Sequence, residues 1–232
     1  MKNLILVTSL LLLCSISHAA EELPTFTGYY AGVTASMPVV SVNLHANHMG
    51  FVSMAGVCDS NGSIVSFSPG AQFGGMFALG ALLRLSLEGT YSYNTPQTAN
   101  LKCQCSTAPG VADRFTFSST MQGTFRGRIG YVLNNLLPYF VVGGNIAGLG
   151  LSYSNEVGDS YAVSTMQMGV LLGAGLEWRM ANAWSLRGQY HFTVNYSADL
   201  RINTIYGVTD AQGAAYAASY ANSLELGINY WF

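Results

Sequence analysis

The feature that most constrains the fold of this chain is the regular alternation of apolar and polar residues in its last stretch, residues 219–232. Every second residue counted back from the end is apolar, which gives one face made of Phe232, Tyr230, Ile228, Leu226 and Leu224. The opposite face carries Trp231, Asn229, Gly227, Glu225 and Ser223. A period of two is that of a β-strand, because successive side chains of a strand point to opposite faces. An apolar outer face, combined with a carboxylate and an amide on the inner face, indicates a strand of a transmembrane barrel.

Seven further segments show the same alternation and are predicted to be strands: residues 28–37, 70–79, 82–93, 115–131, 138–153, 164–179 and 184–196. Long loops are predicted at 38–68, 94–114, 154–162 and 197–213, and they alternate with short turns at 80–81, 134–135 and 180–183. In residues 138–153 the parity is ambiguous past Gly148, where a bulge is one explanation. The predicted fold is therefore all-β, an eight-stranded antiparallel up-and-down transmembrane β-barrel.

Composition favours a membrane-embedded barrel and excludes other classes. Only 9% of the residues are charged, whereas about 25% is usual for a soluble domain. After the first twenty positions no apolar run reaches the roughly 18 residues that a membrane-spanning helix needs, so a barrel of strands remains. The net charge of −2 is not that of a nucleic-acid-binding protein, and no nucleic-acid partner is expected.

Residues 1–19 have the pattern of a secretory signal peptide, and residues 20–232 are predicted to form the barrel domain. Lys2 supplies the positive charge, residues 4–13 the apolar core, and residues 17–19 a small-residue cleavage site. Removal of the signal leaves Cys58, Cys103 and Cys105 in an exported and therefore oxidising setting. We expect a disulfide from Cys58 to Cys103 or to Cys105, which would tie the first two long loops together.

Four segments carry a resemblance to a known family: FTGYYAGV at 26–33, RGRIGYVLNNLLPYFVVGG at 126–144, LLGAGLEWRMANAWSLRGQYHFT at 171–193 and INYWF at 228–232. They resemble the eight-stranded outer-membrane barrels that include the OmpA transmembrane domain and the opacity-type adhesins. The resemblance implies a location in the bacterial outer membrane, with membrane lipid and lipopolysaccharide around the barrel. The ending also resembles the assembly signal of such barrels, carried here by Leu226, Ile228, Tyr230 and Phe232, which implies recognition by the barrel-assembly machinery.

The connections between the strands predict an orientation. In such barrels short turns lie in the periplasm and long loops lie outside the cell, so both termini are expected in the periplasm. The chain departs from full-length OmpA-type proteins because it carries no carboxyl-terminal peptidoglycan-binding domain, and anchoring to the cell wall is therefore not expected.

The charged residues of the predicted strands fall on the inward parity. Together with His191 they form a predicted charge network in the lumen: Arg84, Glu88, Arg126, Arg128, Glu177, Arg179, Arg187 and Glu225. A lipid-facing Arg at mid-depth costs roughly 2–4 kcal/mol, which explains why the charges avoid the outer face. An eight-stranded barrel is just wide enough for its own side chains to fill, so a packed polar core is favoured over a conducting lumen. Glu177 and Arg187 are expected to face each other across the turn at 180–183.

No catalytic, cofactor-binding or metal site is predicted. His191, Thr193 and Glu225 resemble in residue type the His, Ser and Glu set of a membrane lipid A deacylase. Thr is a poor substitute for Ser, however, and the parity sends His191 and Thr193 into the lumen, whereas lipid A approaches from the lipid side. His45 and His48 have a spacing that can bind a metal, but no third ligand is evident.

The predicted function is that of a non-enzymatic outer-membrane barrel, with a structural or adhesin-like role carried by its external loops. One alternative is a narrow, Arg-lined, porin-like channel, and a weaker one is a lipid A-modifying enzyme. The predicted loops are mildly acidic, which disfavours simple charge binding to anionic glycans. A ligand on a host or on another surface is the partner expected at the loops.

Overall fold

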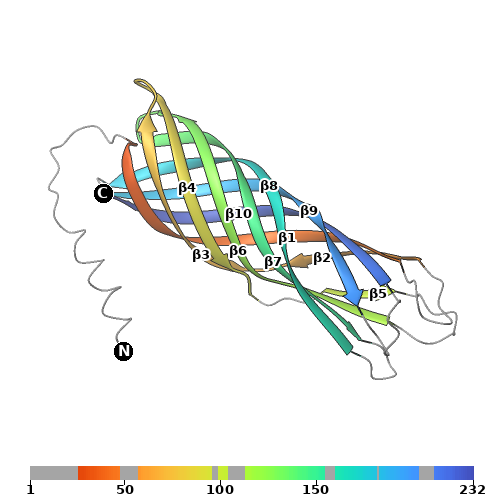
Figure 1. Cartoon of the computed structure of the whole chain (residues 1–232). Helices are drawn as coiled ribbons and strands as arrows, with labels where there is room; N and C mark the ends of the chain where they lie inside the picture. The colour runs from red at the N-terminus through yellow and green to blue at the C-terminus, as the bar shows by residue number, and fades with distance from the viewer. Residues whose placement is uncertain are drawn as a thin grey trace, which may run out of the picture.

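The computed structural model of the protein describes residues 26–47, 57–95, 99–103, 113–154, 160–181, 183–203 and 212–232. These residues form one antiparallel sheet of β1 (Gly28–Asn47), β2 (Val57–Val65), β3 (Ser68–Ala78), β4 (Leu83–Tyr93), β5 (Ala99–Cys103), β6 (Asp113–Tyr131), β7 (Leu136–Ser154), β8 (Ser160–Ala181), β9 (Trp184–Asn203) and β10 (Gln212–Trp231). The sheet closes into a barrel because β10 pairs with β1, from Tyr30–Trp231 to Asn47–Ala214 (Figure 1). In the part of the chain that the structure describes, no helix is long and apolar enough to span a membrane.

Eight strands form the wall of the barrel, because two pairs of segments each act as one strand. β2 and β3 pair with β1 in a single register that is interrupted only at residues 66–67. β4 and β5 both pair with β6. The predicted fold class, an eight-stranded antiparallel up-and-down barrel, is thereby confirmed.

One end of the barrel has short connections, and we refer to it as the turn end. There β3 continues into β4 through residues 79–82, β6 into β7 through residues 132–135, and β8 into β9 next to Ala183. Asn134 has a φ of 54°, in the left-handed region that Asn tolerates better than most residues. Phe232 lies at the same end, where its amide donates a hydrogen bond to the Tyr29 carbonyl (Figure 1).

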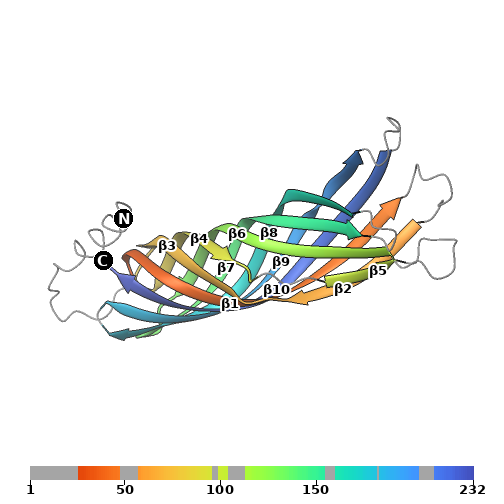
Figure 2. The ribbon, with the colours of Figure 1, turned by 90° about the horizontal axis from the view of Figure 1, so that it is seen from below.

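The opposite end, which we call the loop end, projects beyond what a membrane requires. β1, β9 and β10 have 20 residues each, β6 and β7 have 19, and β8 has 22, whereas about 9–11 residues cross a bilayer. Figure 2 shows these strands extending past β3 and β4, which have 11 residues each.

Part of the projection contradicts the predicted loops. Residues 38–47 and 57–65, expected in the first long loop, pair with each other as the outer parts of β1 and β2. Residues 99–103 likewise form β5 within the second predicted loop. In residues 40–47 the apolar residues Val40, Val42, Leu44 and Ala46 still alternate with polar ones, but on the parity opposite to that of the apolar residues in 29–37. Residues 57–65 show no alternation. Alternation with apolar residues on the outward parity therefore marks the membrane band and underestimates the length of the strands.

The two faces of the wall differ as the alternation predicts. Outward side chains are large, apolar and exposed, for example Phe140 (72% exposed), Met166 (71%) and Phe73 (70%). Inward side chains such as Gln189 and Ser86 are polar and buried. A water-soluble protein places its apolar residues inside, so the inverted arrangement is that of a barrel whose outer surface contacts hydrocarbon.

A bulge interrupts the alternation in β6. Ser119 pairs with Leu149 and Gln122 pairs with Ala147, so β6 contains one residue more than β7 between these two pairs. A bulge was predicted near Gly148 in β7. The bulge lies at this position along the barrel, but the extra residue is in the neighbouring strand β6. As a consequence Ser119 and Gln122, which differ in parity, both line one internal cavity of about 30 Å³, enough for one or two water molecules.

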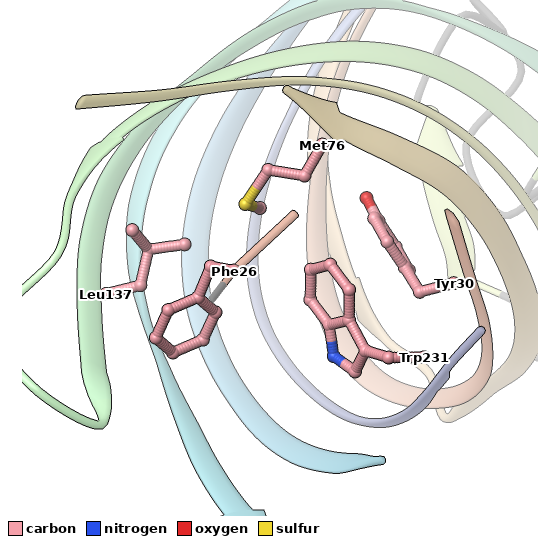
Figure 3. Packing of buried hydrophobic residues seen from close by; sticks show 5 residues of the cluster. All are labelled: Phe26, Tyr30, Met76, Leu137 and Trp231. Carbon is pink, nitrogen blue, oxygen red and sulfur yellow. The ribbon is translucent and has the colours of Figure 1, made fainter. Parts of the chain in front are cut away.

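An apolar cluster closes the lumen at the turn end (Figure 3). It consists of Phe26, Tyr30, Met76, Leu137 and Trp231, each 4% exposed or less. The Trp231 ring centroid lies 4.9 Å from that of Tyr30 and 6.1 Å from that of Phe26. Phe26 precedes β1 and Trp231 ends β10, so the packing of these rings joins the two strands at the closure of the barrel.

Candidate functional site in the lumen

Six charged side chains meet in the lumen, and we call them the lumen cluster: Glu88 from β4, Arg126 and Arg128 from β6, Glu177 from β8, Arg187 from β9 and Glu225 from β10. They come from five strands, and the alternation turns each of them inward. All six are 4% exposed or less. Three guanidinium and three carboxylate groups cancel in formal charge, so the cluster as a whole is neutral.

Glu88 has more cationic neighbours than either of the other two carboxylates of the lumen cluster. Its Oε2 lies 2.5 Å from Arg187 Nη1 and 3.4 Å from Arg128 Nη2, and its Oε1 lies 3.6 Å from Arg126 Nη1. The Tyr30 hydroxyl donates a 2.8 Å hydrogen bond to Oε2 as well. One side chain therefore links β1, β4, β6 and β9 across the lumen.

Glu225 connects the last strand to the same cations. Arg126 binds it through two parallel hydrogen bonds, Nη1 to Oε1 at 3.0 Å and Nη2 to Oε2 at 2.9 Å. Arg187 Nη2 lies 2.6 Å from Oε1. Two parallel N–H···O bonds between a guanidinium and a carboxylate are the strong and directional form of this interaction.

Glu177 and Arg128 complete the lumen cluster on the turn-end side. Arg128 Nη1 donates to Glu177 Oε2 at 3.0 Å, while the Ser185 hydroxyl donates to Oε1 at 2.6 Å. The Arg128 guanidinium also stacks on two tyrosine rings, 4.8 Å from the centroid of Tyr139 and 5.2 Å from that of Tyr30. These contacts replace water around a buried cation, whose desolvation would otherwise cost several kcal/mol.

Arg84 and Arg179 were predicted in the charge network but lie nearer the turn end. Arg84 Nη1 donates to the Gly80 carbonyl at 3.0 Å and to the carbonyls of Ala81, in the same turn, and Leu83, the first residue of β4. The Arg179 guanidinium lies over the Trp231 ring, 4.9 Å from its centroid, at the edge of the apolar cluster.

Glu177 and Arg187 are Cα partners, as we expected from the turn at 180–183, so the predicted register of this hairpin is correct. Their side chains nevertheless form ion pairs with partners from other strands. Glu177 binds Arg128, and Arg187 binds Glu88 and Glu225. In a barrel this narrow, a long side chain reaches across the lumen as readily as it reaches its neighbour on the wall.

The residues with catalytic resemblance also lie in the lumen. His191 is 5% exposed and Thr193 is 2% exposed, and His191 Nδ1 lies 3.3 Å from the Gln189 amide nitrogen. The Glu225 carboxylate is engaged by Arg126 and Arg187. This carboxylate therefore does not orient a histidine base, and the set is separated by the wall from any substrate that arrives through the membrane.

Several predictions fall on residues or side chains that the structure does not describe. They concern the signal peptide at 1–19, Cys105 and His48, and the side chains of His45, Cys58 and Cys103. The backbones of the last three lie in β1, β2 and β5, in the outer part of the barrel. Among the described residues, no three His, Cys, Asp or Glu side chains form a group that could hold a metal ion.

The four residues of the predicted assembly signal lie on the outer wall of β10 and just after it. Leu226 is 57% exposed, Ile228 42% and Phe232 53%. The Tyr230 ring packs edge-on against Trp184, with centroids 5.1 Å apart, and against Phe232.

Sequence reasoning missed the uncharged partners of the lumen cluster. They are Tyr30, Gln72, Ser86, Thr90, Thr124, Ser185 and Asn229, which bind its charged groups through hydroxyl or amide groups. All seven have inward parity, and that signal was present in the sequence. What was missing is the height of each residue along the lumen, which depends on the stagger between strands.

Comparison with known proteins gives a consistent result. The family model described as outer membrane protein beta-barrel domain matches residues 6–232. The 25 kDa outer-membrane immunogenic protein of Brucella abortus is 32% identical over 113 residues, which cover 48% of this chain and 46% of that protein. The match thus spans about half the length of this relative.

Two solved structures are also similar to this chain. The outer membrane protease OmpT from Escherichia coli has a TM-score of 0.54 at 7% identity, covering 93% of this chain and 99% of that one. Neisserial surface protein A has a TM-score of 0.42 at 15% identity, covering 89% and 98%. At such low identity the likeness to the protease shows a shared barrel fold and nothing about activity.

Proposed function

The chain belongs to the outer-membrane protein β-barrel family, and from that premise we propose that it is a non-enzymatic surface protein whose projecting strands carry an interaction surface. In the proposed orientation the turn end and both termini lie in the periplasm, and the loop end lies outside the cell, as is usual for bacterial barrels. The observation that carries the proposal is the projection of β1 and β6–β10, each with 19 residues or more, beyond the membrane band.

The filled lumen supports a structural role for the internal charges. The lumen cluster is buried and neutral, and the apolar cluster of Phe26, Tyr30, Met76, Leu137 and Trp231 lies between it and the turn end. An ion passing along the lumen would have to separate several buried ion pairs, and removing one partner from such a pair typically costs about 3–5 kcal/mol. This energy supports a packed core over the porin-like alternative.

The projecting strands support a role outside the cell. A barrel needs only about ten residues per strand to cross the membrane, so the remaining length is available for contact with other molecules. The relative in Brucella abortus is named an immunogenic outer-membrane protein, and immune recognition of a barrel requires accessible external parts. A ligand on a host cell or on another surface fits such an exposed structure.

Shortened hairpins test the proposal. The β7–β8 hairpin is cut back to the Leu149–Thr165 pair and closed with Asn-Gly, a dipeptide that suits a two-residue turn. The β9–β10 hairpin is cut back in the same way to the Asn195–Ser219 pair. Both changes leave the lumen cluster intact. We expect cells that carry the doubly shortened barrel to bind host-cell monolayers no better than cells without the protein.

The matched control changes only the turn end. Asn134→Gly keeps the left-handed conformation possible and leaves the loop end unchanged, so its binding should equal that of the wild type. Heat-dependent electrophoretic mobility verifies that each barrel is folded. Binding by the doubly shortened barrel at the wild-type level would contradict the proposal.

A further inference from the structure

The outer wall of the barrel contains an apolar groove of about 680 Å³. Its sides are formed by Phe73, Tyr91, Phe125, Ile146 and Met168, which come from five neighbouring strands, β3, β4, β6, β7 and β8. These side chains point outward and are between 47% and 70% exposed. No charged residue lines the groove. Its volume lies within the range of sites that bind small molecules in proteins.

The groove exists because its floor lacks side chains. Gly89, Gly123 and Gly144 lie on β4, β6 and β7, and each occupies an outward position beside a bulky residue: Gly89 and Gly144 both face Phe125 across the ladder, and Gly123 faces Tyr91. The Phe73 ring covers Gly89, where an added Cβ would lie 3.1 Å from it. A Cβ added at Gly123 would meet no atom within 4 Å, and one at Gly144 would meet only the Gly169 carbonyl, at 3.7 Å. The neighbouring side chains therefore do not fill the space above these two glycines.

The height of the two open glycines places the floor of the groove in the leaflet nearer the loop end. Gly123 and Gly144 each lie about 19 Å above the turn end of their strand, from a rise of about 3.4 Å per residue and a strand tilt of about 45°. The sides run obliquely across the wall, because the same estimate gives about 12 Å for Phe73 and about 31 Å for Met168. The apolar band of a bacterial barrel is about 25 Å tall. At the height of the two glycines the outer wall of the barrel is surrounded by the hydrocarbon of the membrane. Water is therefore not available to fill the groove there.

We propose that the groove binds one acyl chain of lipopolysaccharide, the lipid of the outer leaflet. The assignment to this leaflet rests on the orientation given under the proposed function. The apolar lining and the bare glycine floor suit a flexible hydrocarbon chain, which lies against the backbone at Gly123 and Gly144 between the rings of Phe73, Tyr91 and Phe125. The polar residues of the lining, Gln72, Thr90, Thr124 and Asn145, have inward parity, so the side chains that face the groove from outside are apolar.

The test uses two leucine substitutions on the same strand and the same face. Gly123→Leu fills the floor of the groove, whereas Gly127→Leu places an equal side chain outside the lining, where a Cβ would meet only the Val142 carbonyl, at 3.8 Å. Each full-length barrel is extracted from outer membranes in mild detergent, and native mass spectrometry measures the fraction that retains lipopolysaccharide. We expect one bound molecule on the wild type and on the Gly127→Leu barrel, and at least a tenfold lower bound fraction with Gly123→Leu.

Four results would overturn the proposal. Two of them are equal retention in the two variants and a wild-type barrel without bound lipid. The third is a wild-type dimer that Gly123→Leu dissociates, which would make a second copy of the chain the occupant. The fourth is retention of a phospholipid in place of lipopolysaccharide. Protease treatment of intact cells reports independently which end of the barrel lies outside the cell. A barrel in the inverted orientation would contradict the proposed function, and this result is distinct from that of an empty groove.

Discussion

At the scale of single residues, the lumen cluster shows how a charge is kept inside a membrane protein. Glu88 has three guanidinium neighbours and the Tyr30 hydroxyl, and at 1% exposure it has almost no contact with water. A carboxylate in this environment stabilises the fold only together with its cations, because each of them would be costly alone. The stability of the barrel should therefore respond strongly to the charge of this one side chain.

Glu88→Gln keeps the shape of the side chain and removes its charge. It leaves the lumen cluster with one uncompensated positive charge, which should lower the free energy of unfolding by about 3–5 kcal/mol. Urea unfolding of the barrel refolded in detergent measures the change. The double variant Glu88→Gln/Arg187→Gln restores neutrality, and its cost should be smaller than the sum of the two single costs. Additive costs would mean that the two residues do not stabilise each other.

The sequence predicted which residues are inside, but not which of them bind each other. The alternation put Glu177 and Arg187 on the inner face and gave the correct register between them. Their actual partners, Arg128 and Glu88, come from β6 and β4 and reach them across the lumen. Which residues meet across the lumen depends on the stagger between all the strands of the barrel. The local sequence around one residue does not determine this stagger.

At the scale of strands, β10 combines two tasks on its two faces. Inward, Trp231 packs against Phe26 and Tyr30 and closes the turn end. Outward, Phe232 is 53% exposed and contacts the Tyr230 ring, an arrangement in which it contributes little to the packed interior. Phe232 is part of the predicted assembly signal. We therefore expect it to matter for assembly in cells more than for the stability of the folded barrel.

Substitutions at the end of β10 should separate stability from assembly. Phe232→Ala should refold in detergent with nearly wild-type stability, yet reach the outer membrane at a much lower level in cells. Trp231→Ala creates a cavity in the apolar cluster and should cost about 3–5 kcal/mol in unfolding experiments. Membrane fractionation and urea unfolding provide the two readouts. Wild-type membrane levels of Phe232→Ala would contradict the assembly role.

The lengths of the strands were predicted well in the membrane and poorly outside it. β4 was expected at 82–93 and occupies Leu83–Tyr93, because lipid on one side and the lumen on the other enforce the alternation. β1 was expected to end at residue 37 and continues to Asn47. Beyond residue 37 its backbone hydrogen bonds still favour pairing. The apolar residues Val40, Val42 and Leu44 then take the opposite parity, so the pattern that marks the membrane-facing wall ends before the strand does.

At the scale of the whole molecule, the filled lumen predicts that the protein does not conduct ions. The wild-type barrel in a planar lipid bilayer should give no reproducible current steps. A channel-forming porin in the same bilayers serves as the positive control for detection. Steps with anion preference in the wild type, abolished by changing Arg126 or Arg128, would show that the lumen is a channel.

The cysteines make a second prediction at this scale. β2 and β5 carry Cys58 and Cys103, and each continues a strand of the β3–β4 hairpin toward the loop end. We expect Cys58 to be linked to Cys103 or to Cys105. Thiol titration of the unfolded mature protein should then give one reactive thiol before reduction and three afterwards. Three thiols without reductant would exclude the disulfide.

The ion pairs of the lumen cluster also set an order of events during folding. Arg126 binds Glu225, and Arg187 binds Glu88, across 99 residues of sequence in both cases. Neither pair can form while β1 and β10 are apart, because the residues meet only across a closed lumen. An unclosed sheet that entered the bilayer would present six bare charges to hydrocarbon, at roughly 2–4 kcal/mol for each Arg. Closure of the barrel should therefore accompany or precede its full insertion, so that intermediates lying flat at the membrane surface accumulate before the membrane is crossed.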